Sequence, residues 1–474
     1  MQAARLAPAL VTLALTAVLA ACTPRTIEGL PKFEARGCPM SYRDLPVTFT
    51  CGHLLVPETR GDPDSRVLRL FVSIARAEGG SAPDPVIFAD GGPGYAPSDS
   101  IPYLFDDSWL EPIETAASMP PLLPPGRDVI FIDPRGTGRS APNLDCGPDP
   151  WINRAGVLAE TIWALCVRMA RLSGVDFNAY GSAEMAADIA DLRTALGLEA
   201  FNLWGVSHGT RVAMTVLRDR PDGVRSVVLD SPFFPENPDT EDWPWLVERE
   251  VKDIFTWCRR DPACSNEHWD TLRMFEARAR EWIKAGAATI GGRTYQLRDL
   301  SAYLIFALYD PHRAPHLPYH LKELVEGRDD DLALITDFDS GAADLQAALV
   351  TCSEEAPFET AERMREKAGD GIIAQLVMTD YLETNCSGLA LASPDPIENQ
   401  PVESDVPILA LAAEIDPGCP VEYARSAARF LPNAQVVELR GRTHAVIQVS
   451  SCGRQLMAAF LADPTKPVDS SCAR

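Results

Sequence analysis

A serine and a histidine stand side by side between two glycines in the stretch Gly205-Val206-Ser207-His208-Gly209. An apolar run precedes this G-x-S-x-G pattern and a helix-forming run follows it, which is typical of a tight strand-to-helix turn that exposes a serine hydroxyl. The two glycines allow the turn to pack closely against its neighbours. A serine hydroxyl is a weak nucleophile until a base takes its proton, so these residues predict nucleophilic catalysis assisted by a base elsewhere in the chain.

The base should be one of the seven histidines. His208 is adjacent in sequence, but the residue after such a serine turns its side chain away and contributes its backbone N–H. Residues 312–320 carry three histidines at four-residue spacing, like a metal-binding stripe, but two prolines in this segment argue against a regular helix face. His444 lies in the sequence GRTHAV, in a loop after the last predicted strand, and we predict that it is the base.

The acid that orients the histidine and stabilises its charged form should lie at the end of another strand. Asp416 follows the predicted strand 406–413 in the sequence AAEIDPG and opens a turn. It precedes His444 by 28 residues, which gives the chain order Ser, Asp, His. Asp230, at the end of the strand after the serine turn, and Glu414 are the alternatives. We predict Asp416, because an Asp-Pro-Gly turn suits an exposed carboxylate at a strand tip.

A glycine-rich loop follows a predicted strand upstream of the serine, in the sequence Gly91-Gly92-Pro93-Gly94. Glycines there let backbone N–H groups come close to a substrate, so Gly92 and the backbone N–H of His208 are predicted to form an oxyanion hole. A phosphate-binding loop is the rival interpretation, but the Lys-Ser/Thr ending of that motif is absent. We expect no cofactor or metal ion, because no C-x2-C pair exists and the histidines do not cluster near cysteines.

These residues need a sheet whose strand ends meet at one edge. Strand-like runs occupy 67–77, 85–94, 127–140, 200–209 (which includes the sharp turn), 224–233, 406–417 and 434–446. A helical run covers 182–198, with Ser182 as its predicted N-cap. Alternation of strands with helices predicts an α/β fold with a mostly parallel sheet covered on both faces. The pattern is helical from about 236 to 400, which predicts a helical domain inserted between the core segments 41–235 and 401–474.

The first 22 residues have the features of a secretory signal: one arginine, an apolar stretch and then small residues. The sequence LAAC at 19–22 resembles a bacterial lipobox, in which Cys22 becomes the lipidated first residue; ordinary signal cleavage nearby is the alternative. Residues 23–40 are polar and irregular and predict a tether. We therefore expect an exported lipoprotein anchored to a membrane through Cys22. In a Gram-negative source, Thr23 after the cysteine favours the outer membrane on its periplasmic side.

The composition is that of a globular protein, with 474 residues of which 46% are hydrophobic. A net charge of −24 argues against nucleic acid as a partner and against electrostatic attachment to anionic lipid. Twelve cysteines fit an oxidising compartment. With Cys22 set aside, pairing of sequence neighbours gives the bridges 38–51, 146–166, 258–264, 352–386 and 452–472, and leaves Cys419 unpaired.

Five motifs in order carry a family resemblance: GGPG at 91–94, DPRGTGRS at 133–140, GVSHG at 205–209, EIDP at 414–417 and GRTH at 441–444. This set resembles the α/β-hydrolase peptidases of the prolyl aminopeptidase and tripeptidyl aminopeptidase family, over nearly the whole mature chain. The resemblance implies the α/β-hydrolase fold with a helical cap at 236–400. It also implies that Ser207, Asp416 and His444 are nucleophile, acid and base, and that Gly92 lies in the oxyanion loop.

The same resemblance implies release of residues from a free peptide N-terminus, through an acyl-enzyme on the serine. Glu354 and Glu355, in the sequence CSEEAPF of the cap, are the candidates for binding the substrate ammonium; a solvated acidic pair at a helix end is the alternative. Asp90, His208 and Cys419 depart from the residues common in the family. A carboxylesterase acting on small esters, and a binding lipoprotein without catalytic activity, are the competing functions.

Overall fold

The computed structural model describes residues 27, 29–110, 119–147, 157–238, 240–330, 332, 343–381 and 386–474. Within these residues the main sheet has nine strands, in the order β1-β2-β3-β5-β4-β6-β7-β10-β11. The strands are β1 (Lys32–Arg36), β2 (Phe49–Pro57), β3 (Val67–Ala75), β4 (Val86–Ala89), β5 (Val129–Ile132), β6 (Phe201–Val206), β7 (Val224–Asp230), β10 (Ile408–Ile415) and β11 (Ala434–Thr443). The strands from β5 to β11 in this order are parallel, and β1 to β3 form an antiparallel edge. The predicted α/β class is therefore confirmed.

Hydrophobic side chains on the two faces of the sheet form two separate cores. In β6, Phe201 and Leu203 belong to one core and Trp204 and Val206 to the other, as the two-residue repeat of a strand requires. The first core is closed by α4 (Ser182–Leu196), α5 (His208–Asp219) and α15 (Val421–Ala427), and the second by α2 (Pro97–Leu104), α16 (Val446–Val449) and α17 (Ser451–Ala462). Burial on both faces holds the strand ends in fixed positions, which the site requires.

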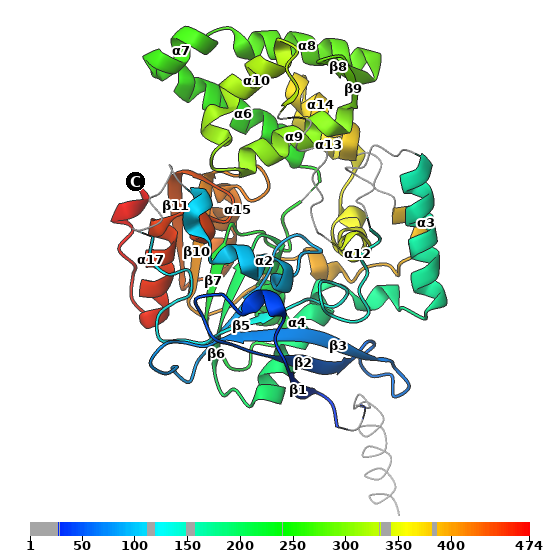
Figure 1. The fold of residues 1–474 in the computed structure, drawn as a ribbon, viewed down its shortest axis with the longest axis vertical. Helices are drawn as coiled ribbons and strands as arrows, with labels where there is room; N and C mark the ends of the chain where they lie inside the picture. The colour runs from blue at the N-terminus through cyan, green and yellow to red at the C-terminus, as the bar shows by residue number, and fades with distance from the viewer. Residues whose placement is uncertain are drawn as a thin grey trace, which may run out of the picture.

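A helical cap lies above the sheet and has a hydrophobic core of its own (Figure 1). Its helices are α6 (Trp243–Arg260), α7 (Pro262–His268), α8 (Thr271–Ala285), α9 (Leu297–Tyr309), α10 (Leu317–Val325), α13 (Ala361–Ala368) and α14 (Ile372–Tyr381). Two short strands, β8 (Ala287–Ile290) and β9 (Arg293–Gln296), form a hairpin among them. Helix α12 (Asp344–Glu354) packs instead with Tyr180 of the main domain, through Leu345 and Leu349. The 236–400 segment is thus divided among three hydrophobic clusters, since Val350 of α12 also packs in the first core of the sheet.

Part of the segment predicted as a tether is a strand. Residues Lys32–Arg36, with the sequence KFEAR, form β1 and pair antiparallel with β2. Charged residues alternate with Phe33 and Ala35, which is typical of a short edge strand that is protected by charge. The sequence pattern was too short to distinguish this strand from an irregular polar segment.

The predicted signal peptide, including Cys22, lies outside the described residues. Export and lipidation therefore stay predictions from the sequence. Across the part of the chain that the structure describes, no helix combines the length and the apolar character needed to cross a bilayer.

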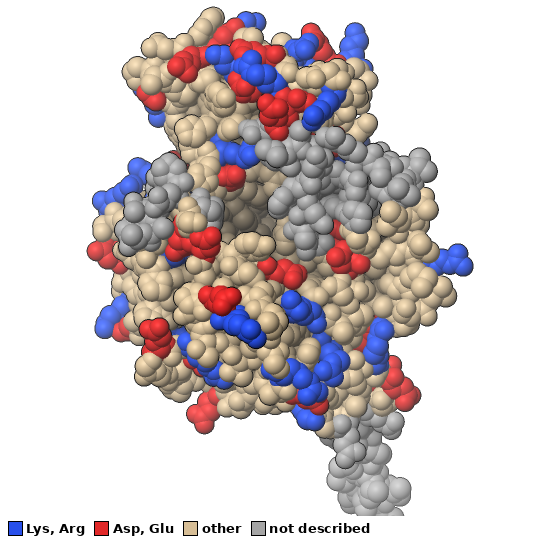
Figure 2. Space-filling view, viewed as in Figure 1, with Lys and Arg blue, Asp and Glu red and all other residues tan. Residues whose placement is uncertain are grey.

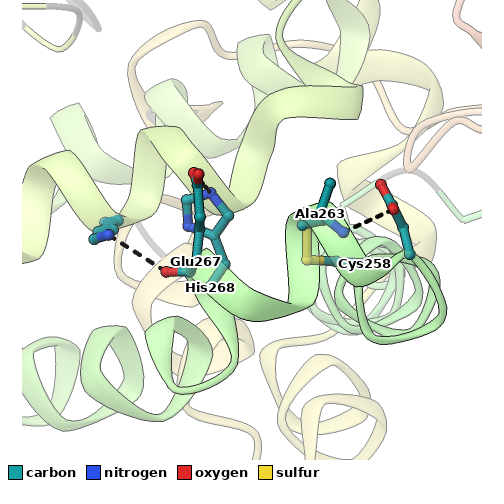
Figure 3. Close-up of a disulfide and its surroundings, with 7 residues drawn as sticks. Cys258, Ala263, Glu267 and His268 are labelled. Atoms are coloured by element: carbon teal, nitrogen blue, oxygen red, sulfur yellow. Dashed lines mark hydrogen bonds and ion pairs between the residues drawn. A yellow bond between two sulfur atoms is a disulfide. The ribbon is translucent and has the colours of Figure 1, made fainter.

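Five disulfides join cysteines of the described residues: Cys38–Cys51, Cys146–Cys166, Cys258–Cys264, Cys352–Cys386 and Cys452–Cys472. They are the five bridges predicted from sequence proximity, and Cys419 is buried and lies outside these disulfides. Figure 3 shows the bridge at Cys258, which joins the end of α6 to α7. Beside it, Asp261 accepts a hydrogen bond from the N–H of Ala263 at 3.0 Å and caps α7. This corner of the cap is therefore held covalently and by a helix cap.

The N-terminus of α4 is capped differently from the sequence prediction. Ser182 is the first helical residue, and Gly181 occupies the N-cap position. The Ser182 hydroxyl donates to Oε2 of Glu354 at 2.6 Å, and its backbone N–H donates to Oε1 of the same carboxylate. The prediction of Ser182 as the N-cap is therefore wrong. A carboxylate from α12 replaces it and suits the positive end of the helix dipole.

Candidate active site

Ser207 lies in the turn between β6 and α5, with a backbone φ of 53° and ψ of −126°. A positive φ is uncommon for a residue other than glycine and marks a strained turn that its surroundings hold in place. The Ser207 N–H donates to the carbonyl oxygen of Asp230 at 2.9 Å. A Cβ on Gly205 would lie 2.4 Å from the carbonyl oxygen of Gly209, and a Cβ on Gly209 would lie 2.0 Å from that of Ala89. Close packing therefore requires both glycines of the motif.

His444 and Asp416 form the hydrogen bond expected between a base and its orienting acid, with 2.8 Å between Nδ1 and Oδ2. Asp416 follows β10 and is 1% exposed, and its other oxygen accepts from the N–H of Cys419 at 3.0 Å. Burial by itself lowers the pKa of His444, but the charge and hydrogen bond of Asp416, together with Asp230, outweigh burial and raise that pKa above its usual value. The imidazolium is therefore stabilised, which suits a group that accepts a proton.

The two other acid candidates bind backbone N–H groups. Asp230 ends β7 and is fully buried, and its Oδ2 accepts from the N–H of Ile447 at 3.1 Å. Burial raises the pKa of Asp230 to about 7. Glu414 accepts from the N–H of Gly441 at 2.7 Å. The geometry favours Asp416 as the partner of the imidazole, and Asp230 instead fixes the loop that follows the histidine.

Ser207 and His444 line the same cavity, which has a volume of about 520 Å³. The cavity lies between the cap and the core, where the space-filling view is hollowed (Figure 2). Its wall includes Gly91, Gly92, His208, Ile305, Phe306, Tyr309, Ala347, Val350 and Thr351. A Cβ on Gly91 would lie 3.1 Å from the Cβ of Ser207, so the predicted oxyanion loop passes directly beside the serine. Gly92 has a φ of 106°, which only glycine adopts without strain.

The His208 side chain is buried at the start of α5 and lines the cavity. Its Nε2 lies 3.3 Å from the Ser182 hydroxyl. Burial, assisted by the positive charge of Arg211, lowers the pKa of His208 to about 4. The negative charge of Glu354 acts in the opposite direction. The ring is therefore neutral at neutral pH and is a poor base. The backbone N–H of His208, at a helix N-terminus, remains suited to an anion.

Glu354 and Glu355 are both buried and pair with the fully buried Arg211. The Arg211 Nε lies 2.9 Å from Glu354 Oε2, and its Nη1 lies 2.7 Å from Glu355 Oε1. Glu355 also lines the cavity, whereas Glu354 is not among the described residues of the wall. This burial excludes a solvated acidic pair. The two carboxylates therefore share one guanidinium next to the cavity.

Some residues of the cavity wall carry no motif that would reveal them. Tyr309, at the end of cap helix α9, stacks on His444 with ring centroids 4.4 Å apart. A Cβ on Gly418 would lie 2.2 Å from the Tyr309 hydroxyl oxygen, so the Asp-Pro-Gly turn needs its glycine to admit the ring. Asp90 and Cys419, which the sequence marks only as departures from the family, also line the cavity.

One cluster in the described residues combines side chains that could bind a metal ion. Ligand atoms of Asp416, Cys419 and His444 lie within 4.8 Å of one another. The carboxylate and the imidazole already share a hydrogen bond, so a cation there would compete with that contact. Of the three histidines of 312–320, His312 lies in a turn, His316 ends a 3-10 helix and His320 lies in α10, so they do not share one helix face.

Comparison with known proteins gives two family matches. A model described as the alpha/beta hydrolase fold matches residues 84–272, and a model described as TAP-like protein matches residues 373–472. Serine protease Hip1 of Mycobacterium tuberculosis is 24% identical over 468 residues, which cover 89% of this chain and 87% of that protein. YuaR of Escherichia coli is 22% identical over 457 residues, which cover 89% of this chain and 87% of YuaR.

Two solved structures that resemble the chain are a peptidase and an esterase. Proline iminopeptidase of Mycobacterium smegmatis has a TM-score of 0.38 at 16% identity, and the match covers 87% of this chain and 98% of that chain. An esterase of Thermogutta terrifontis has a TM-score of 0.39 at 16% identity, and the match covers 87% of this chain and 99% of the esterase chain.

The parallel sheet and the family match over 84–272 define the chain as a hydrolase of the α/β-hydrolase fold. The TAP-like match over residues 373–472 and the similarity to Hip1 make the chain similar to peptidases of the tripeptidyl aminopeptidase type. The chain is a serine hydrolase of the α/β-hydrolase fold. The family resemblance and the fold predicted from the motifs are thereby confirmed.

Proposed function

We propose that the protein is a serine exopeptidase in which Ser207 attacks the peptide carbonyl, His444 moves the proton and Asp416 orients the imidazole. The observation that carries this proposal is the 2.8 Å bond from His444 to Asp416, at the wall of the cavity that Ser207 also lines. The positive φ of Ser207 supports the same assignment, because a turn of this shape presents the serine hydroxyl at a sheet edge.

The first half of the reaction forms an ester. The Ser207 oxygen bonds to the carbonyl carbon while its proton moves to Nε2 of His444, and Asp416 stabilises the imidazolium that results. The backbone N–H groups of His208 and Gly92 donate to the negative oxygen of the tetrahedral intermediate. His444 then gives the proton to the leaving amine as the C–N bond breaks. The N-terminal part of the substrate remains as an acyl group on Ser207.

The second half of the reaction hydrolyses that ester. His444 takes a proton from a water molecule, whose oxygen bonds to the acyl carbon. When the second tetrahedral intermediate collapses, the Ser207 oxygen leaves and recovers a proton from His444. The products are the released amino acid or short peptide and the free enzyme.

Recognition of the substrate ammonium is assigned to Glu355, because its carboxylate lines the cavity and is held there by Arg211. Glu354 acts through its position, since it caps α4 and completes the pairing of the arginine. The position of the cap above the cavity supports cleavage near a chain end.

The test compares three substrates of one amino acid: its p-nitroanilide, the N-acetylated p-nitroanilide and a p-nitrophenyl ester. The proposal predicts that kcat/KM falls by about a hundredfold when the amine is acetylated, because a buried carboxylate then loses a charge-assisted hydrogen bond. Equal rates with free and blocked amines would instead support the carboxylesterase. Inactivity on all three substrates and on a tripeptidyl amide would support the binding lipoprotein.

We further propose that Cys22 is lipidated and anchors the exported protein to a membrane, on the sequence signal alone. Cells that express the full chain should hold it in the membrane fraction, and Cys22→Ala should release it. Retention of Cys22→Ala in that fraction would contradict the lipid anchor. The expected partners are peptide substrates and the membrane, and nucleic acid is not expected, since the net charge is −24.

A further inference from the structure

Asp90 occupies an unusual place for a carboxylate, between β4 and the predicted oxyanion loop. It lines the 520 Å³ cavity that contains Ser207. On its other side it borders a second cavity of about 30 Å³, which also touches His208 and Gln346 and has room for about two water molecules. The next residue, Gly91, lies against the serine, since a Cβ there would be 3.1 Å from the Cβ of Ser207. The charge of Asp90 is therefore close to the reacting atoms.

The charge of Asp90 has little compensation from the protein. Its Oδ1 accepts from the N–H of Gly91 at 2.8 Å, and its Oδ2 accepts from the hydroxyl of Ser100 at 3.4 Å. Within the described residues no lysine, arginine or histidine forms an ion pair with it. The charged group that acts on it is Asp99, which is also acidic, and burial together with this neighbour raises the pKa of Asp90 to about 6.

A purely structural role does not explain a charged residue here. The hydrogen bond to Gly91 that shapes the loop needs an acceptor oxygen, which an asparagine would supply equally well. An anion at this position also opposes the negative charge that develops on the substrate oxygen in the adjacent oxyanion hole. A carboxylate is therefore favoured here only when a cation from outside the protein accompanies it.

We propose that Asp90 is a specificity-determining residue that binds the free α-ammonium of the substrate, together with Glu355, when the enzyme releases a single N-terminal residue. This proposal rests on the proposed function and adds a second ammonium ligand and a limit on substrate length. In such a substrate the ammonium is two bonds from the attacked carbonyl carbon, close to the loop that carries Asp90. Each additional residue moves the ammonium about 3.3–3.6 Å further away.

The test measures the preference ratio of Asp90→Asn, which is kcat/KM for an aminoacyl p-nitroanilide divided by kcat/KM for its N-acetyl derivative. Asparagine keeps the acceptor for Gly91 and removes the charge. The expected result is a fall in this ratio of about tenfold or more, because a charge-assisted contact is lost. The hydrolysis of N-acetyl substrates and p-nitrophenyl acetate should stay equal to that of the wild type or rise, because repulsion of the oxyanion is relieved.

The matched control is Asp99→Asn, which removes an exposed carboxylate of α2 that does not belong to the described cavity wall. Its preference ratio should equal that of the wild type at pH 8, where Asp90 is ionised in both proteins because its pKa is about 6. Three results for Asp90→Asn would overturn the inference. They are an equal fall in kcat/KM for all substrates, an unchanged preference ratio, and a loss of activity confined to a tripeptidyl amide. A wild type with no preference for the free amine would instead refute the proposed function, so the two failures are distinguishable.

Discussion

The core and the cap side of the molecule contribute different things to the cavity. The core places its reactive groups at strand ends and in tight turns: Ser207 after β6, Asp416 after β10 and His444 after β11. The cap helix α9 and the neighbouring α12 contribute side chains from helix ends, with Tyr309 against the imidazole and Glu355 beside the arginine. In the proposed mechanism, backbone geometry therefore positions the groups that make bonds, and helix side chains select the substrate. Substitutions in the two regions should fail in different ways.

Ser207→Ala should produce the largest effect, and the effect should be the same for every substrate. The attacking oxygen is lost, so kcat is expected to fall by about 10⁶-fold. The measurement is p-nitroaniline or p-nitrophenol release from the amide and ester substrates, with an unchanged melting temperature as the control for folding. Activity close to that of the wild type would mean that another residue is the nucleophile.

Asp416→Asn should have the second largest effect, a loss of about 10⁴-fold in kcat. An amide neither orients the required tautomer of His444 nor stabilises its imidazolium. Asp230→Asn is the matched variant, since that buried carboxylate also influences His444 but hydrogen-bonds to Ile447. Its loss should be much smaller. Equal losses in the two variants would contradict the assignment of the acid.

Arg211→Met should act on stability more than on chemistry. It leaves Glu354 and Glu355 buried without their shared cation, which is expected to cost about 3–5 kcal/mol in the free energy of unfolding. Urea denaturation measures this loss. Arg218→Met, which removes a less buried partner of Glu398, should cost less. A variant of Arg211 as stable as the wild type would show that the cluster is not a coupled unit.

Glu355→Gln should change selectivity and leave the bond-making step intact. We expect the preference for a free over an acetylated amine to fall by about tenfold, because the contact with the ammonium loses its charge. Hydrolysis of p-nitrophenyl acetate should be nearly unchanged. The matched variant, Glu354→Gln, should keep the preference and lose stability, since it weakens the cap of α4. If Glu355→Gln lowered the activity equally for all substrates, Glu355 would have to act in the bond-making step and not in selectivity.

The smallest effect concerns the position of the acidic limb in the pH dependence of kcat/KM. Asp416 raises the pKa of His444, and the imidazole must be neutral to accept the serine proton, so activity should fall as the pH drops through that pKa. The wild-type limb is expected above the usual histidine value of about 6.5. In Asp416→Asn the limb should move to lower pH. An acidic limb that moves to higher pH in Asp416→Asn would contradict the claim that Asp416 raises the pKa of His444.

Sequence alone predicts the core part of the site because tight turns demand particular residues. Gly205 and Gly209 admit no Cβ, and local cysteine spacing leads to the five observed bridges. The cap side could not be predicted in the same way. The contact between Ser182 and Glu354 joins residues 172 positions apart, and it depends on how α12 packs. The stacking of Tyr309 likewise depends on the placement of an inserted domain whose helices have no fixed register with the sheet.

The central claim is that His444, held by Asp416, activates Ser207 in the cavity between cap and core. The most direct test is the rate and site of labelling by a fluorophosphonate, followed by intact-mass spectrometry and peptide mapping. The account predicts one adduct per chain, on Ser207, with labelling greatly slowed in His444→Ala and absent in Ser207→Ala. An adduct on another residue, or labelling of His444→Ala at the wild-type rate, would contradict the account.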